Sequence, residues 1–175
     1  MEVSFQQWGL DFIGEIHPSS SAQYKWILTA TYYFSKWIKA ILTRHAAYLV
    51  IIQLLEGNIL SRFGYSRKII TDNTVEFKSR KLIDFCNRYN IVLGHSTTYY
   101  PQGNGLVESS NKGLVNIIKK LLWENKKTWH KKLINALWAH RVSTKKSIGM
   151  SPFQLVYGVD VVFPTSLGVL IMKLL

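Results

Sequence analysis

The sequence predicts an α/β domain in which a five-stranded mixed sheet is flanked by helices. Three consecutive runs of β-branched and aromatic residues open the chain, which is typical of an antiparallel meander. The hydrophobic period then changes from two residues to about 3.6, and helical stripes alternate with short apolar runs. Strands separated by helices imply parallel crossovers, so the sheet must combine both kinds of pairing.

The first three strands are predicted over Trp8–Ile16, Tyr24–Phe34 and Trp37–Leu42. Segment 17–21, with sequence HPSSS, has turn chemistry and separates the first two. A helix is expected next, over Ala46–Phe63, and Gly64 should end it. Its expected apolar face consists of Leu49, Ile52, Leu55 and Ile59.

The second half of the predicted sheet alternates with helices. A strand over Lys68–Thr71 precedes a helix capped by Ser79 that runs to about Tyr89. The run Ile91–Leu93 is the expected fifth strand. The segment Ser96–Gly105 contains a proline and two glycines among polar residues, which indicates a loop.

Three further helices are predicted after this loop. They cover Leu106–Trp123, Lys127–Val142 and a short segment that begins with Ser151 as cap and Pro152 in the first turn, and ends at Gly158. His140 falls on the apolar stripe of the second of these helices, so it is expected to be a packing residue. Cys86, the single cysteine, lies at helical spacing with apolar neighbours and is expected to be a buried thiol.

Length and charge restrict the kinds of protein that this chain can be. We expect one domain over residues 1–175, since 175 residues with 47% hydrophobic content suffice for one core. Lys and Arg number 22 against 10 Asp and Glu, a formal net charge of +12 that favours a polyanionic partner. No secretory signal is recognisable, and no apolar run reaches the ~20 residues of a membrane span.

Three carboxylates are the candidate catalytic and metal-binding residues: Asp11, Asp72 and Glu108. Asp11 lies within the first strand, where acids are uncommon, and Asp72 directly follows the fourth strand. Glu108 lies in the first turn of the long helix, where the helix dipole favours an acid. Thirty-five residues separate Asp72 from Glu108.

With its flanking residues, this set resembles the integrase cores of long-terminal-repeat retrotransposons, particularly the gypsy type, and more distantly retroviral integrases. Four strings carry the resemblance in order, with the D,D-35-E spacing of that family, and they extend over nearly the whole chain: WGLDFIG at 8–14, TDN at 71–73, YPQGNGLVE at 100–108 and SPFQLVYG at 151–158.

The resemblance implies an RNase H-like fold and a polynucleotidyl transferase that processes and joins DNA ends. Two Mg²⁺ or Mn²⁺ ions would assist the phosphoryl transfer, because carboxylates are the hard ligands that Mg²⁺ prefers. Asp11 would bridge both ions, Asp72 would hold one and Glu108 the other. A homo-oligomer acting on DNA in the nucleus is expected, without the zinc-binding and C-terminal domains that flank such cores in relatives.

DNA contacts are expected on both sides of Glu108. Lys112 lies one helical turn beyond it on the same face, and Lys119 and Lys120 extend the positive charge. Gln102 and Asn104, on the preceding loop, would contact DNA by resemblance. Asn73 either orients the substrate or caps the turn.

Some positions depart from the family pattern, and two other functions stay open. Relatives often carry Asp at Tyr32, Glu at Lys39, Gly at Thr74, Pro at Thr98 and Gln at Leu106. If the turn at Thr74 requires positive φ, its β-branched side chain is strained beside Asp72. The alternatives to integration are a decayed or co-opted core that binds nucleic acid without catalysis, and a ribonuclease H-type nuclease.

Overall fold

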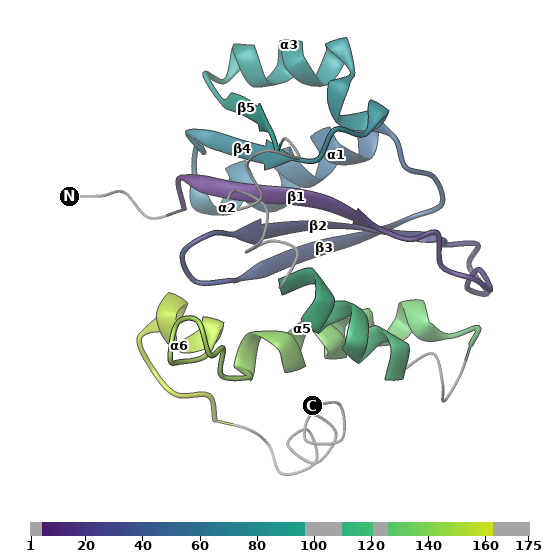
Figure 1. Ribbon diagram of the computed structural model, residues 1–175, viewed down its shortest axis with the longest axis vertical. Helices are drawn as coiled ribbons and strands as arrows, with labels where there is room; N and C mark the ends of the chain where they lie inside the picture. The colour runs from purple at the N-terminus through teal and green to yellow at the C-terminus, as the bar shows by residue number, and fades with distance from the viewer. Residues whose placement is uncertain (1–4, 97–109, 121–125, 163–175) are drawn as a thin grey trace.

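Five strands form one mixed sheet in the order β3-β2-β1-β4-β5 (Figure 1). The structure is a computed structural model that describes residues 5–96, 110–120 and 126–162. The five predicted strands are confirmed, with ends that differ from the predicted ones by up to three residues: β1 covers Gln7–Ile13, β2 Trp26–Tyr32, β3 Ile38–Thr43, β4 Lys68–Thr71 and β5 Val92–His95.

Pairing within the sheet follows the predicted combination. Strand β2 pairs antiparallel with both β1 and β3, whereas β4 pairs parallel with both β1 and β5. Strand β1 ends three residues earlier than predicted, before Gly14, which has a φ of +150°. A Cβ atom at this glycine would lie 2.8 Å from the Trp26 ring, so the close approach of the two strands requires glycine here.

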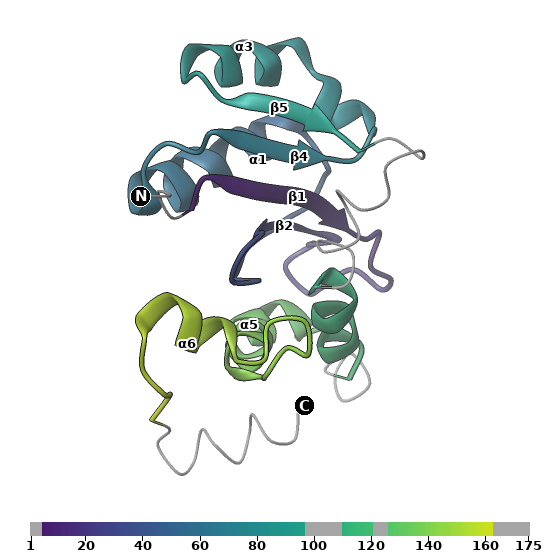
Figure 2. The same ribbon diagram turned by 60° about the vertical axis from the view of Figure 1, so that its left-hand side comes forward.

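Helices cover both faces of the sheet and enclose two separate cores (Figure 2). Alternate residues of a strand point to opposite faces, and β1 shows this plainly. Trp8 and Leu10 are buried in the core formed with α1 (Tyr48–Leu54) and α3 (Arg80–Arg88). Ile13 packs in the other core, against the helical segment 110–120 and α5 (Leu133–Val142).

The first predicted helix is interrupted by a π-helical turn. Helix α1 is followed by the π-helix η1 (Leu55–Leu60) and the short α2 (Ser61–Phe63). Gly64 ends α2 with a φ of +76°, as predicted. The expected apolar face was wrong at Leu49, which is exposed. Leu55 and Ile59 are buried as predicted and Ile52 is partly buried, while Ile51 and Leu54 complete the buried face.

The later elements agree with the sequence patterns more closely inside each helix than at its ends. The 3₁₀ helix η2 (Val75–Lys78) precedes α3, at whose N-cap Ser79 makes no side-chain hydrogen bond. The predicted helix 127–142 is divided into the 3₁₀ helix η3 (Trp129–Lys132) and α5. The helix predicted over 106–123 is helical throughout its described part, 110–120.

The last helix, α6 (Pro152–Tyr157), begins and ends as predicted. The Ser151 hydroxyl accepts a hydrogen bond from the Gln154 amide, and the Gln154 side chain accepts one from the Ser151 amide. This capping box satisfies two N–H groups that the helix itself cannot pair. Gly158 ends the helix in the left-handed conformation. Over the described ranges, no helix has the length and apolarity that a bilayer crossing requires.

Cys86 and His140 are buried, which confirms the predicted packing roles. Burial raises the pKa of the Cys86 thiol to about 11, so the sulfur stays protonated and unreactive near neutral pH. His140 belongs to α5, is 1% exposed, and faces the segment 110–120. Desolvation, followed by the charges of Lys145 and Arg141, lowers the pKa of His140 to about 3.

His140 should make the stability of the fold pH-dependent. An unfolded chain protonates this imidazole near pH 6.5, whereas the folded chain does not until about pH 3. The free energy of unfolding should therefore fall as the pH decreases below 6.5, by roughly 2 kcal/mol by pH 5. Urea titrations at pH 7 and 5 should show a smaller difference in His140→Leu. The exposed-histidine control His17→Gln should keep the full difference. An undiminished difference in His140→Leu contradicts this assignment.

Candidate functional site

Asp11 lies in β1, two residues before the strand ends at Ile13. Because Leu10 points into the core beneath α1 and α3, its neighbour Asp11 points to the opposite face. That face is covered by the helical segment 110–120, which continues the helix predicted to contain Glu108. The alternation of β1 therefore directs a half-buried carboxylate toward the long helix.

A hydrogen-bond network fixes Asp11 against this helix. The side-chain amide of Asn111 donates to Asp11 Oδ2 over 2.7 Å. The Thr29 hydroxyl, on neighbouring β2, lies 3.1 Å from the Asp11 carbonyl oxygen and 3.3 Å from Asn111 Oδ1. Asn111 and Thr29 are 5% and 0% exposed. Since neither can rotate freely into solvent, they hold the Asp11 carboxylate in one orientation.

Asp72 directly follows β4, next to β1 in the sheet. The parallel register pairs Gln7 with Lys68, and Asp11 and Asp72 each come four residues later. Continuing that register places the two acids at the same level on neighbouring chains, which are about 4.8 Å apart in a sheet. Parallel pairing therefore brings together two acids separated by 60 residues.

The turn after Asp72 is unstrained, so the hypothesis of strain at Thr74 was wrong. Thr74 has a φ of −66° and a ψ of 156°, an extended conformation that any residue adopts. Its backbone N–H donates to Asp72 Oδ1 over 3.0 Å. This short Asx-type bond stabilises the turn with threonine in place, so Thr74→Gly has no strain to release.

Strand β5 supports the backbone of Asp72 through His95. The buried Thr71 hydroxyl donates to the Asp72 carbonyl oxygen over 2.9 Å and lies 2.9 Å from His95 Nδ1. His95 Nδ1 also lies 3.3 Å from the Asp72 carbonyl oxygen, so the imidazole, the hydroxyl and the carbonyl form one polar cluster. Asn73 donates to the Ser96 carbonyl oxygen over 2.9 Å. It thus ties the β4 turn to the end of β5, a structural contact that differs from the predicted capping of the turn.

A cleft of about 330 Å³ opens beside Asp11 and is lined on its helical side by amides and cations. Its wall includes Asn111, Lys112 and Lys119, so the structure brings two of the predicted DNA-binding lysines to the predicted catalytic acid. Both lysines are exposed. The cleft combines an anchored carboxylate with positive charge, an arrangement that can hold a phosphodiester near metal-binding oxygens.

Glu108, Gln102 and Asn104 lie outside the described residues. Among the residues that are described, no group of three or more His, Cys, Asp or Glu side chains could by itself hold a metal ion. Asp11 and Asp72 nevertheless fit a divalent cation, because they contribute carboxylate oxygens at one level of the sheet. Together they form two parts of the predicted three-acid set.

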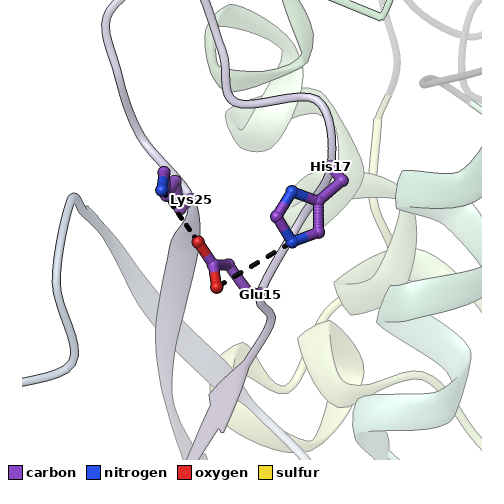
Figure 3. Close-up of polar contacts among 3 residues, drawn as sticks. All are labelled: Glu15, His17 and Lys25. Carbon is purple, nitrogen blue, oxygen red and sulfur yellow. Dashed lines mark ion pairs between the residues drawn. The ribbon is translucent and has the colours of Figure 1, made fainter.

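Another acid near this region, Glu15, is already engaged in an ion pair. Its carboxylate lies 2.9 Å from Lys25 Nζ and 3.8 Å from His17 Nε2, in the connection between β1 and β2 (Figure 3). The hydrogen bond from Lys25 lowers the pKa of Glu15. Glu15 therefore serves the connection between the two strands and is not placed with Asp11 and Asp72.

Sequence reasoning missed Asn111, Thr29 and His95. A signal for Asn111 was present, since it follows Glu108 by three residues and so shares its helical face. Thr29 and His95 gave no such signal, because their contacts depend on strand pairing. Two of the positions that depart from the family pattern have structural contacts. Tyr32 packs in the core against Trp8, and Lys39, on β3, lies above the ring of Phe63. Neither contacts the candidate site.

Comparison with known proteins agrees with this geometry. The family model described as "Integrase core domain" matches residues 3–101. The Gag-Pol polyprotein of Avian reticuloendotheliosis virus is 31% identical over 153 residues, and the Pol polyprotein of Feline endogenous virus ECE1 is 33% identical over 153. These alignments cover 87% and 86% of the chain but only 13% and 14% of the polyproteins.

Solved structures share the fold at lower identity. The HTLV-2 integrase catalytic core domain in complex with magnesium, in a trimeric form, matches with a TM-score of 0.67 and 22% identity. That match covers 87% of this chain and 97% of the other. A chain of the simian T-cell lymphotropic virus intasome matches with a TM-score of 0.73 and 20% identity, over 93% of this chain and 57% of that one. The fold is therefore the RNase H-like one of integrase catalytic cores, and with the family match over residues 3–101 the chain belongs to the integrase core domain family.

Proposed function

We propose that this chain is a metal-dependent polynucleotidyl transferase that processes and joins the DNA ends of a gypsy-type long-terminal-repeat retrotransposon. One observation carries the proposal: Asp11 borders a cleft lined by Lys112 and Lys119, and the parallel ladder of β1 and β4, continued two residues past Gly9 and Ile70, would bring Asp72 level with Asp11. Membership of the integrase core domain family supports the class of reaction.

The acids would hold two Mg²⁺ or Mn²⁺ ions, with Asp11 shared, Asp72 on one ion and Glu108 on the other. When bound, such ions activate the attacking oxygen and stabilise the leaving one in an in-line phosphoryl displacement. Asn111 orients one oxygen of Asp11. The Thr71 hydroxyl fixes the carbonyl of Asp72, and the Thr74 amide fixes one of its side-chain oxygens. The protein thus contributes preorganised ligands and requires no covalent intermediate.

DNA would be held along the helical wall of the cleft. Lys112 and Lys119 would each neutralise a phosphate, and the net charge of +12 would favour the approach of a polyanion. Gln102 and Asn104 are assigned to the DNA by family resemblance. Asn73, which bonds to Ser96, is assigned to the architecture of the turn rather than to direct contact.

Assembly and location belong to the same proposal. One solved relative is an intasome and another a trimeric catalytic core, so we propose that this chain also works as a homo-oligomer on DNA. Its substrate would then be chromosomal DNA in the nucleus. The chain spans about an eighth of the length of the polyproteins that it matches. The other activities of such polyproteins are therefore not part of this proposal.

Neutralising any acid of the set should abolish Mg²⁺-dependent joining. In a strand-transfer assay on purified protein, Asp11→Asn, Asp72→Asn and Glu108→Gln should each lower the rate at least about a thousandfold, because several kcal/mol of charge stabilisation is lost. Circular dichroism should show an unchanged fold. The matched control Glu15→Gln should join DNA normally, since this exposed acid pairs with Lys25.

Different outcomes separate the three candidate functions. Joining that survives in Asp11→Asn or Asp72→Asn removes that residue from the reaction. Wild-type protein that binds DNA but joins none, with either metal, would identify a decayed or co-opted core. Cleavage of an RNA–DNA hybrid without joining of DNA ends would identify the ribonuclease alternative.

The lysines of the cleft should account for part of the salt dependence of duplex binding. Lys112→Ala should reduce the slope of log K against log salt by about 0.9, the value for one neutralised phosphate, and Lys119→Ala should do the same. Fluorescence anisotropy with a labelled duplex measures this slope. Lys131→Ala, an exposed lysine of η3 with the same charge, should leave it unchanged. Equal slopes in all four proteins refute the proposed surface.

Asn111 should be required for the correct placement of Asp11. The isosteric change Asn111→Asp replaces the N–H donor with a like charge 2.7 Å from Asp11 Oδ2. Displacement of a reacting group by about 1 Å can cost on the order of 100-fold in rate. We expect a loss of that size together with a different Mg²⁺ concentration for half-maximal activity. Asn116→Asp, which lines the same cleft, controls for the added charge. Equal losses in both variants contradict the positioning role.

A further inference from the structure

A second pocket lies at the opposite end of the parallel strands from the candidate acids. It has a volume of about 560 Å³, within the range of small-ligand sites, and its lining residues come just before β1, β4 and β5. Figure 1 shows these three strands side by side. Gln6 and Arg67 precede β1 and β4 in the chain by one residue each. Asp11 and Asp72 lie five residues further on, or about 16 Å along the strands. The pocket is therefore separate from the cleft beside Asp11.

The same pairing that aligns the acids builds this pocket. The backbone amides of Arg67 and Lys68 both donate to the Gln6 carbonyl oxygen, over 2.9 and 3.0 Å. The Val92 amide donates to the Arg67 carbonyl oxygen over 2.9 Å. Arg67 is thus held on both sides by the sheet, and Arg88, the last residue of α3, forms the opposite part of the wall.

Positive charge in the pocket has no carboxylate beside it among the described residues. Arg67 and Arg88 are both exposed, and neither forms an ion pair within the described ranges. Asp84 lies one helical turn before Arg88 but makes no ion pair with it there. The described residues that line the pocket include no acid. Guanidinium groups are suited to bind a phosphate by paired hydrogen bonds, and both arginines line this pocket.

An aromatic surface accompanies the two arginines. Tyr65 is 65% exposed, and its ring lies 5.7 Å from that of Tyr89 with an interplanar angle of 30°. Tyr89 in turn packs on the Phe85 ring at 4.8 Å, so the pair is anchored to the core. One face of an anchored, exposed tyrosine is a platform on which a nucleobase can stack.

Two buried polar atoms border the same pocket. Gln6 Oε1 and Ser66 Oγ have no hydrogen-bond partner in the described part of the chain. Leaving such an acceptor unpaired costs about 1–3 kcal/mol, and both residues line the pocket. Both atoms are themselves buried, so a ligand in the pocket reaches them only if the Gln6 and Ser66 side chains turn toward it.

We propose that this pocket binds single-stranded nucleic acid, with a phosphate between Arg67 and Arg88 and a base stacked on Tyr65. A single strand fits better than a duplex, because only an unstacked base can reach the tyrosine. The chain would then hold two nucleic-acid segments at once, one at each end of the parallel strands. This inference does not depend on catalysis by the acids.

Photocrosslinking and anisotropy together test the proposal. In EDTA, labelled oligo-dT should lose at least about tenfold in affinity for the double variant Arg67→Ala, Arg88→Ala, and the salt slope should fall by about 0.7 for each phosphate that is no longer neutralised. Tyr65→Ala should weaken binding roughly 5- to 150-fold, the equivalent of stacking one base, whereas Tyr65→Phe should retain it. Irradiation of oligomers containing 5-bromodeoxyuridine should crosslink the peptide that carries Tyr65.

Controls distinguish this pocket from a general effect of charge. The double variant Arg44→Ala, Arg80→Ala removes the same charge from exposed sites outside the pocket and should bind oligo-dT normally. Thermal melting should confirm that every variant is folded. Wild-type affinity in the double variant Arg67→Ala, Arg88→Ala, equal losses for oligo-dT and duplex, or crosslinks confined to the segment 110–120 would overturn the proposal. Because binding is measured without metal, failure of DNA joining has no bearing on it.

Discussion

The parallel pairing of β1 with β4 is the constraint on which the other features of the molecule depend. It sets Asp11 and Asp72 at one level of the sheet, and at the opposite end it brings Arg67 to Gln6. Both strands have a neighbour on each side, so neither can slip without breaking two ladders of hydrogen bonds. A one-residue slip would also turn Asp11 into the apolar core and expose Leu10. The register is therefore fixed by burial.

Burial on both faces of the sheet explains why an acid can be tolerated in β1. The side of the strand that carries Asp11 is covered by a helix, and the covering residue there is Asn111, a hydrogen-bond donor rather than an apolar side chain. A half-buried carboxylate with no hydrogen-bond donor beside it would destabilise the fold, and the Asn111 amide supplies a donor. The strand and the long helix therefore depend on each other at this position, and a change to either side chain affects both.

Uncompensated positive charge distinguishes this fold from an ordinary basic protein. Desolvation lowers the pKa of Lys39 and Lys145 to about 8 and that of Arg141 to about 10, so the fold holds cations where water solvates them poorly. Glu15 pairs with Lys25 and His17, and the chain as a whole carries 22 Lys and Arg against 10 Asp and Glu. Such a surface is stabilised when a polyanion approaches, which agrees with the chemistry proposed for both ends of the parallel strands.

The sequence alone predicted the mixed sheet and nearly every element within it, and it named Asp11 and Asp72 as candidates for one site. It could do so because hydrophobic period, turn residues and spacing are local properties. Tertiary structure decided the rest. The support of Asp72 by His95 and the hold of Asn111 on Asp11 arise from interactions between segments distant in the chain. Local patterns carry no information about such interactions, because strand register and helix packing bring these side chains together only in the folded protein.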